Sequence, residues 1–272
     1  MWYKLSIPLF HLGECDQGQN LLSFALKQAS PISYSIPPYV QIAEGLIAQI
    51  ESGALCPGEQ LPPERELSEN FGVTRMTLRR ALHVLEVQGL IIRKHGIGTY
   101  IAEPKIERKM EVIFRFSSDM HQRGFTPQAK IISFEQIMAE SSMAKDLMVP
   151  ISAPIYSILR LRSINHEPVM LESYLIPVPR FPGLDQYDLE NRSIYEILED
   201  EYGVSIARAR QNFEPVVATD FEAKLLNISV GDALMMEKRL SYDAHNLPIE
   251  FGKDRYRGDR FRFVTEAVPF SL

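Results

Sequence analysis

The spacing of apolar residues predicts a first amphipathic helix just after residue 37. Ile42, Leu46, Ile47 and Ile50 recur at intervals of three and four positions, which places them on one face of a helix. Gly53 follows the last of them and is a typical helix stop.

Two further short helices are expected before residue 90. The stretch "PERELSENF" opens with proline, which is tolerated in the first helical turn, and Gly72 ends it. Thr74 is a good N-cap for the next helix, in which Leu78, Leu82 and Leu85 form the buried stripe. The polar side of this last helix is therefore free to face a partner.

The segment "LIIRKHGIGTYIA" predicts a β-hairpin behind the helices. Leu90–Arg93 and Thr99–Ala102 are the two strands, and Gly96 and Gly98 at the tip allow backbone conformations closed to other residues. Three helices followed by a two-stranded wing form a winged helix-turn-helix over residues 37–103.

The pattern changes to alternating strands in residues 111–267, which predicts a second domain of the α+β class with an antiparallel sheet. "EVIFRF" is the first expected strand, and "SSDMHQRG", "SIYEILEDEYG" and "TDFEAKLLNI" are expected helices. Two segments resemble each other, "LRLRSINHEPVMLESYLIP" and "MEKRLSYDAHNLPIEFGKDRY". Each contains a strand, a polar turn with histidine and a strand opened by proline, so two similar hairpins are expected.

The remaining segments show no sustained periodicity. Residues 1–36, rich in proline and serine near their end, are expected to form a flexible extension, and an upstream start codon is an alternative explanation. The charged stretch "EPKIERKM" suggests a linker over residues 104–110.

Composition narrows the class of protein. A chain of 272 residues has the length of about two domains. No apolar run approaches the roughly 18 residues of a membrane helix, and the N-terminus makes a poor signal peptide, so a cytoplasmic protein without membrane association is expected. Neither cysteine has metal-ligand spacing, and no motif requires a cofactor.

The third helix concentrates arginine in a chain whose formal net charge is −6. Helical spacing puts Arg75 and Arg79 on the exposed side, with Thr77 nearby. In a major groove an arginine donates two hydrogen bonds to guanine, and a threonine hydroxyl suits a phosphate. The alternative is that each of these residues is ordinary solvated surface. The basic, glycine-rich wing that follows the helix favours DNA binding over this alternative.

Residues 58–102 resemble the DNA-binding domain of GntR-family bacterial transcriptional regulators. The resemblance rests on "GEQLPPERELSENFGVTRMTLRRALHVLEVQGLIIRKHGIGTYIA". It implies operator DNA as a partner, a homodimer, and DNA contacts by Arg65, Arg75, Thr77, Arg79 and Gly98, with Gly96 close by.

In the second domain, Arg160 and Arg162 lie two apart on an expected strand, so both point to one face. Two arginines on one face can clamp a phosphate or carboxylate. Glu172 lies on the pairing strand, and Glu250 on the later hairpin. The alternative is an exposed sheet face with cross-strand ion pairs.

The stretches "ILRLRSINHEPVMLESYLIP" and "LPIEFGKDRYRGDRFRF" resemble the UTRA effector-binding domain, which marks the HutC branch of the GntR family and has a fold similar to chorismate lyase. The resemblance implies a small anionic effector, such as a phosphorylated sugar. It implies binding by the following residues: Phe116, Ser117, Arg160, Arg162, Glu172, Ser193, Tyr195, Glu250 and Tyr256.

The expected function is therefore sequence-specific DNA binding controlled by an effector, as a repressor or, alternatively, an activator. A lyase-like enzyme domain fused to a DNA-binding module is the other reading, with Glu172 or Glu250 as the proton carrier. No nucleophile–base pair, metal spacing or phosphate-binding glycine loop favours it, so we expect no enzyme.

Overall fold

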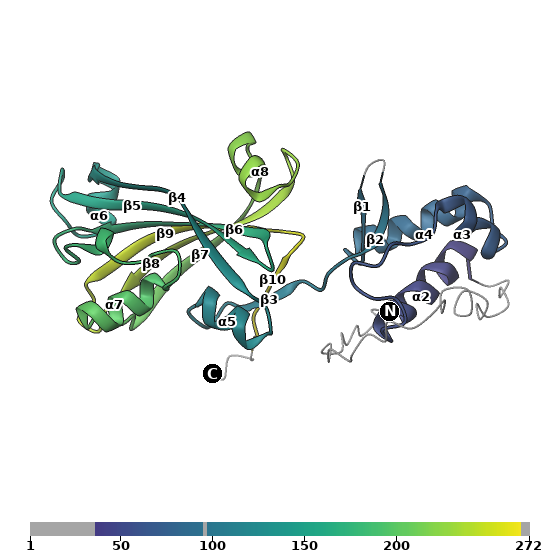
Figure 1. Cartoon of the computed structure of the whole chain (residues 1–272), viewed down its shortest axis with the longest axis horizontal. Coiled ribbons are helices and arrows are strands. Elements are labelled where there is room, and N and C mark those ends of the chain that lie inside the picture. The colour runs from purple at the N-terminus through teal and green to yellow at the C-terminus, as the bar shows by residue number, and fades with distance from the viewer. Residues whose placement is uncertain (1–35, 95–96, 268–272) are drawn as a thin grey trace, which may run out of the picture. The chain divides into compact units, whose positions relative to one another are not determined.

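The computed structural model describes residues 36–94 and 97–267, and the chain divides into two compact units, Met1–Pro104 and Lys105–Leu272 (Figure 1). Each unit has a hydrophobic core of its own. Residues 1–35 of the expected extension, and Gly96 at the expected wing tip, lie outside the described residues.

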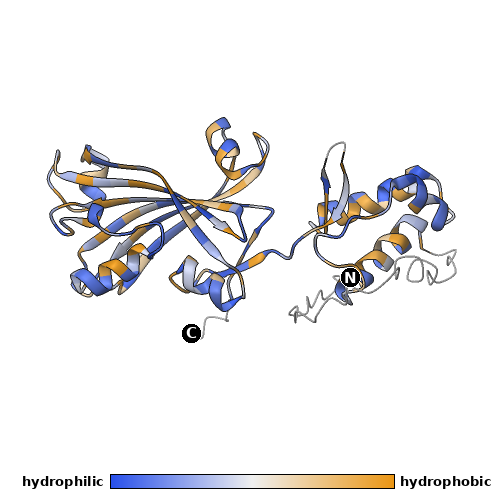
Figure 2. Ribbon diagram, viewed as in Figure 1, coloured by the Kyte–Doolittle hydropathy of each residue, from blue (hydrophilic) through white to orange (hydrophobic). Residues whose placement is uncertain are grey.

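Three helices and a two-stranded antiparallel sheet make up the first unit, as the apolar pattern predicts. They are α2 (Pro38–Glu51), α3 (Glu64–Asn70), α4 (Arg75–Val87), β1 (Ile91–Lys94) and β2 (Gly98–Ile101). The apolar stripes of α2 and α4 face each other, with Leu46, Leu78 and Leu82 among the least exposed residues of this core (Figure 2). Thr74 caps α4, since its side chain accepts a hydrogen bond from the Thr77 N–H.

The loop between α2 and α3 extends the small sheet in a way that the sequence did not suggest. The Leu61 N–H donates to the Thr99 carbonyl, and the Ile101 N–H donates to the Glu59 carbonyl, both at 2.8 Å. Gln60 thereby forms a bridge to Tyr100. The wing is anchored along β2 to the same loop that leads into α3.

A six-stranded sheet forms the centre of the second unit, with the order β4-β5-β6-β9-β8-β7 and all neighbours antiparallel. Its strands are β4 (Pro127–Met138), β5 (Pro154–Ile164), β6 (Glu167–Pro177), β7 (Arg208–Val217), β8 (Ala233–Tyr242) and β9 (Pro248–Arg257). The two expected hairpins are β5–β6 and β8–β9. The turn of β5–β6 uses Asn165 and His166, both at positive φ, as a tight hairpin turn requires.

The two hairpins belong to a larger internal repeat. The succession β4, α6 (Ser141–Asp146), β5, β6 recurs as β7, α8 (Asp220–Leu226), β8, β9, and the two copies meet at β6 and β9. Both hairpins shift register at the same point, between Arg162 and Ser163 and between Ser241 and Tyr242. Arg160 lies two residues before Arg162, and Arg239 lies two residues before Ser241, so the two arginines occupy equivalent positions in the repeat.

Helices cover the two faces of the sheet differently. On one face α6 and α8 pack on leucines and isoleucines such as Leu171 and Ile155. The other face lies toward α5 (Phe116–Gln122) and α7 (Ile194–Tyr202), as Figure 1 shows. Arg160, Arg162 and Glu172 lie on this second face, since they alternate with the residues that pack under α8.

The segment expected as a linker contains a strand. β3 (Ile106–Lys109) pairs in parallel with β10 (Phe261–Val264), and Ile106 and Arg108 are buried. The strand expected at residues 111–116 is absent, because Phe114 packs on the core from an irregular segment and Phe116 begins α5. No helix among the described residues is long and apolar enough to cross a membrane.

Candidate functional site

The arginines expected to contact DNA lie on the exposed surface of the first unit. Arg65 is exposed on α3, and Arg75 and Arg79 are exposed on α4. Arg79 is oriented by an ion pair, because its Nε donates to Glu64 Oε2 on α3 at 2.7 Å. This bond leaves the two terminal nitrogens of Arg79 for a further partner. No pattern along the chain predicted the contribution of Glu64.

Thr77 and Gly98 have structural roles of their own. The Thr77 hydroxyl lies 2.9 Å from that of Thr74, so it takes part in the cap of α4. Gly98 has φ of 149°, and a Cβ there would lie 2.4 Å from Nε2 of Gln60, which donates to the Ile97 carbonyl. Glycine at this position is explained by the packing of the wing.

In the second unit, seven of the nine residues expected to bind an effector line one pocket together with Phe114 and Tyr174. Four elements supply them: Phe116 and Ser117 come from α5, the two arginines from β5 and Glu172 from β6, while Ser193 and Tyr195 open α7. Phe114 and Tyr174 were not expected in the pocket.

Glu172 lies between the two arginines of the pocket. Its Oε2 is 2.6 Å from Nη2 of Arg160 and 3.4 Å from Nη1 of Arg162, and the Tyr174 hydroxyl donates to its Oε1. Burial alone would raise the pKa of Glu172, but the charges of Arg160 and Arg162 lower it to about 2. The ion pair of Arg160 with Glu172 joins neighbouring strands, as the alternative interpretation of the sequence predicted. It is buried, however, and does not lie on an exposed sheet face.

The two arginines differ in their partners. Arg160 donates to Glu172 and also to the Leu189 and Arg192 carbonyls, so it holds the segment that leads into α7. Arg162 is 3% exposed, and its Nη2 donates to Ser117 Oγ at 2.7 Å while its Nε has no partner. Burial lowers the pKa of Arg162, because the attraction of the Glu172 carboxylate, which Arg160 also contacts, does not offset the loss of solvent. Two guanidinium groups thus share one carboxylate, which leaves a positive charge at the pocket.

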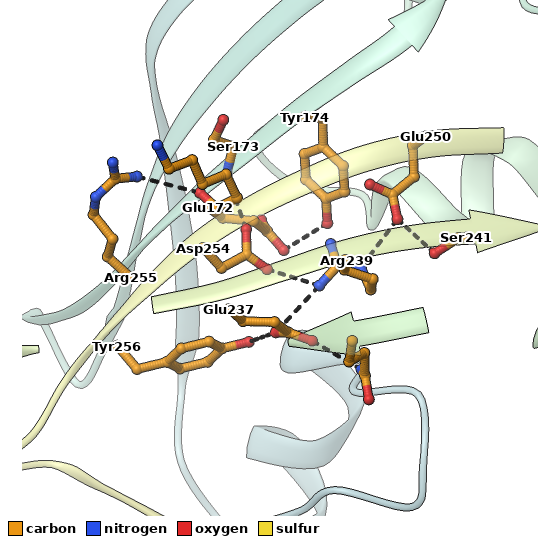
Figure 3. A network of polar contacts seen from close by, with 12 residues as sticks. Glu172, Ser173, Tyr174, Glu237, Arg239, Ser241, Glu250, Asp254, Arg255 and Tyr256 are labelled. Carbon is orange, nitrogen blue, oxygen red and sulfur yellow. Dashed lines mark hydrogen bonds and ion pairs between the residues drawn. The ribbon is translucent and has the colours of Figure 1, made fainter. Parts of the chain in front are cut away.

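Glu250 and Tyr256 do not line the pocket, contrary to expectation. Glu250 lies behind Tyr195, whose hydroxyl donates to its Oε1 at 3.1 Å, and it also accepts from Arg239 and Ser241 (Figure 3). The Tyr256 hydroxyl donates to Glu237. Burial holds the pKa of both tyrosines well above the usual value, so both hydroxyls stay protonated donors. Both expected residues belong to a buried network behind the pocket wall.

This network interrupts the sheet at its centre. The pairing of β6 with β9 breaks between Leu171 and Tyr174, and there the Ser173 N–H donates to Oδ1 of Asp254 at 3.0 Å. The other oxygen of Asp254 accepts from Arg239 at 2.8 Å (Figure 3). A side chain therefore replaces a backbone acceptor where the two repeats meet.

The pocket is small. The space between its lining side chains is about 10 Å³, which is room for about one water molecule. Sites for small organic ligands typically measure about 300–1,000 Å³. A ligand of that size would fit only if the lining side chains, or the elements that carry them, moved apart. No group of residues suited to hold a metal ion occurs within the described ranges.

A helix-turn-helix with exposed arginines, joined to a second domain with a buried cationic pocket, defines a class: two-domain, DNA-binding transcriptional regulators. Comparisons with known proteins agree. Residues 38–101 match the model of "Bacterial regulatory proteins, gntR family", and residues 122–262 match that of the UTRA domain. The chain belongs to the GntR family of regulators, in the branch that carries a UTRA domain.

The relatives are regulators of the same architecture. The "HTH-type transcriptional repressor NagR" of Bacillus subtilis (strain 168) is 38% identical over 229 residues, which cover 84% of this chain and 94% of that protein. The "Mannosyl-D-glycerate transport/metabolism system repressor MngR" of Escherichia coli (strain K12) is 29% identical and covers 84% and 95%. Among solved structures, PhnF from Mycobacterium smegmatis is similar with a TM-score of 0.61 and 27% identity, covering 84% of this chain and 99% of that one.

These similarities distinguish between the two interpretations of the sequence, a DNA-binding regulator and a lyase-like enzyme. They indicate a DNA-binding regulator rather than an enzyme, and they give no support to the lyase reading.

Proposed function

We propose that this protein is a repressor that binds a palindromic operator as a homodimer, in the cytoplasm, and leaves it when a small anionic sugar derivative enters the pocket of the second unit. The single observation that carries the effector class is Arg162. It is buried, it shares its carboxylate with Arg160, and one of its donors has no partner. An anionic group in contact with Arg162 would supply the missing acceptor.

Two further facts support a sugar derivative. The serine and tyrosine hydroxyls around the arginines suit a ligand with several hydroxyl groups. Relatives carry names that refer to sugar-derived compounds, namely fructoselysine and mannosyl-D-glycerate. Catalysis is not part of the proposal, because a carboxyl with a pKa of about 2, such as Glu172, is a poor proton carrier near neutral pH.

For DNA, the proposal assigns the contacts to Arg65, Arg75, Thr77 and Arg79, and to Gly98 and Gly96 in the wing. Arg79 is the sharpest test, since Glu64 orients it and leaves a fork of two nitrogens for guanine. A homodimer places two copies of α4 on a two-fold symmetric site.

The DNA contacts can be tested on sites selected from a random duplex library with the full chain. Arg79→Ala should weaken binding to the selected site by about 1–3 kcal/mol, the contribution of one bidentate arginine–guanine contact. It should weaken binding to unrelated DNA much less, and the selected sites should be palindromic. Arg80→Ala is the matched control: Arg80 is also exposed on α4 but lies outside the proposed set, so the ratio of specific to non-specific affinity should stay unchanged. Equal losses on both kinds of DNA in Arg79→Ala would contradict the assignment.

The effector class can be tested by thermal shift with inorganic phosphate, hexose and hexosamine 6-phosphates, sugar carboxylates and neutral sugars. A ligand at 100 times its dissociation constant should stabilise the protein by about 2.7 kcal/mol. Arg162→Ala should abolish the response and keep the fold, because Glu172 still pairs with Arg160. Arg180→Ala, which removes an ion pair with Asp243 outside the pocket, should respond like the wild type. Stabilisation of wild type and Arg162→Ala alike, or by neutral sugars alone, would refute the anionic effector.

A further inference from the structure

Arg108 is a buried charge on β3, the first strand after the boundary between the two units. Its guanidinium is surrounded by four aromatic rings, those of Phe114, Phe213, Tyr256 and Phe263, at 5.0–5.5 Å from the ring centroids. Its Nη2 donates to Oε1 of Glu237 at 2.8 Å, and both side chains have no exposed surface.

Stability is a poor explanation for an arginine at this position. Its Nε and Nη1 have no hydrogen-bond partner, and burying unpaired donors is unfavourable. The aromatic rings offset part of that cost, yet an apolar side chain would fill the same cage without it. An apolar side chain would lose the directed bond to Glu237, and a neutral donor such as Gln211, which contacts the same oxygen, would not supply the ion pair.

That bond is one end of a continuous chain that begins at the pocket. The Tyr195 hydroxyl, in the pocket wall, donates to Glu250, and Nε of Arg239 donates to the same oxygen at 3.0 Å. Nη1 of Arg239 lies 2.8 Å from Asp254 and 3.4 Å from Glu237 (Figure 3). Because these charges are 0–4% exposed, water and salt screen them little.

Arg239 lies in the middle of this series of contacts, and the second carboxylate oxygen of Glu250 lies near it. A Cβ on Gly252 would lie 2.5 Å from Nη2 of Arg239 and 3.0 Å from Oε2 of Glu250. Both atoms thus lie over the same glycine, and both lack a partner. A change at Glu250 can therefore turn the Arg239 guanidinium and alter its bond to Glu237, which Arg108 shares.

We propose that Arg108 is a positioning residue that couples the pocket to β3 through Glu237, Arg239 and Glu250. When a ligand displaces Tyr195, the hydrogen bonds between Glu250, Arg239 and Glu237 rearrange. The contacts that hold β3 then change, and β3 is the strand that continues into the DNA-binding unit. The purpose of the coupling rests on the proposed function, but the coupling itself lies within the second unit and can be tested without any ligand.

The test is a double-mutant cycle on the full chain, read by amide hydrogen exchange in residues 105–110. In that segment the N–H groups of Ile106 and Met110 donate to the Arg260 and Val264 carbonyls. Glu250→Gln, at the pocket end, should change exchange there by roughly 2- to 30-fold, the range seen for mutations along coupled networks. In the Arg108→Met background the same change at Glu250 should leave the exchange of β3 unaltered.

Controls separate coupling from general loosening. Arg180→Met removes an ion pair that is not part of these contacts. Glu250→Gln should therefore still change the hydrogen exchange of β3 in that background. If Arg108→Met does not fold, Glu237→Gln removes the negative charge from the same link with a side chain of equal shape. Equal effects of Glu250→Gln with and without Arg108, or no effect in either, would overturn the proposal. Because no effector is present, such a result leaves the proposed function standing, and a failed effector screen leaves this cycle interpretable.

Discussion

At the scale of single residues, Asp254 has the least favourable position in the buried network. Its carboxyl replaces a backbone acceptor between β6 and β9 and contacts Arg239. Burial raises its pKa to about 7; Arg239 opposes the shift, while the charges of Glu237 and Glu172 add to it. The group therefore exchanges its proton near neutral pH, unlike Glu172 in the same network.

This position predicts a dependence of stability on pH. Between 3.8, the ordinary value, and about 7, the native protein retains a proton that the unfolded chain has lost. Raising the pH through this window should therefore favour unfolding, by up to about 1.4 kcal/mol per pH unit. Urea unfolding should show this slope between pH 5 and 7 in the wild type, levelling off by pH 8, and a flatter one in Asp254→Asn. Parallel slopes would rule out Asp254 as the titrating group, since all other groups are common to both proteins.

The pocket residues could be predicted from sequence more fully than the network behind them. Arg160 and Arg162 share a face because strands have period two, and their hairpin partner Glu172 is near in sequence. Arg108, Glu237 and Asp254 come together only through pairings between distant strands, which no local pattern reveals. Arg239 was open to prediction from the internal repeat, as the equivalent of Arg160.

At the scale of elements, the helices and hairpins followed their apolar patterns, and errors fell where a segment is short. β3 has four residues, too few for alternation to distinguish a strand from a charged linker. The strand expected at 111–116 does not form, because Phe114 packs half-buried from an irregular segment and Phe116 is buried at the start of a helix. The bridge of Gln60 to Tyr100 was equally invisible, since it joins a loop to a strand 40 residues later.

Helix α2 contains a glycine whose replacement should stabilise the first unit. Gly45 lies in the helix interior, is exposed, and a Cβ there would meet no atom within 4 Å. Gly45→Ala should therefore raise the free energy of unfolding by about 0.5–1 kcal/mol, because alanine loses less backbone entropy. Chemical denaturation measures the change. Gly252→Ala is the opposite case, since its Cβ would clash with Arg239, and it should destabilise the second unit.

At the scale of the whole molecule, the charges of the two units bear on how DNA is bound. Residues 37–103 contain eight acidic and six basic residues, so even the DNA-binding domain is not basic overall. Attraction to phosphates must come from where the arginines lie on α3, α4 and the wing, not from the total. This favours binding that depends on a matched site over binding to any duplex.

Separate cores predict separate unfolding. The core of the first unit and those of the second share no residue, so calorimetry of the full chain should resolve two transitions. Gly45→Ala should shift only one of them, and an effector only the other. A single transition shifted by both would indicate that the two units unfold as one.

The small volume of the pocket has a consequence for the speed of the response. A space of about 10 Å³ is too small for a sugar derivative, so we expect the proposed effector to enter only after the pocket opens. The observed association rate should then stop rising with ligand concentration once it equals the opening rate. An abrupt rise in effector would be registered only after this delay, and brief pulses shorter than the opening time would leave the operator occupied.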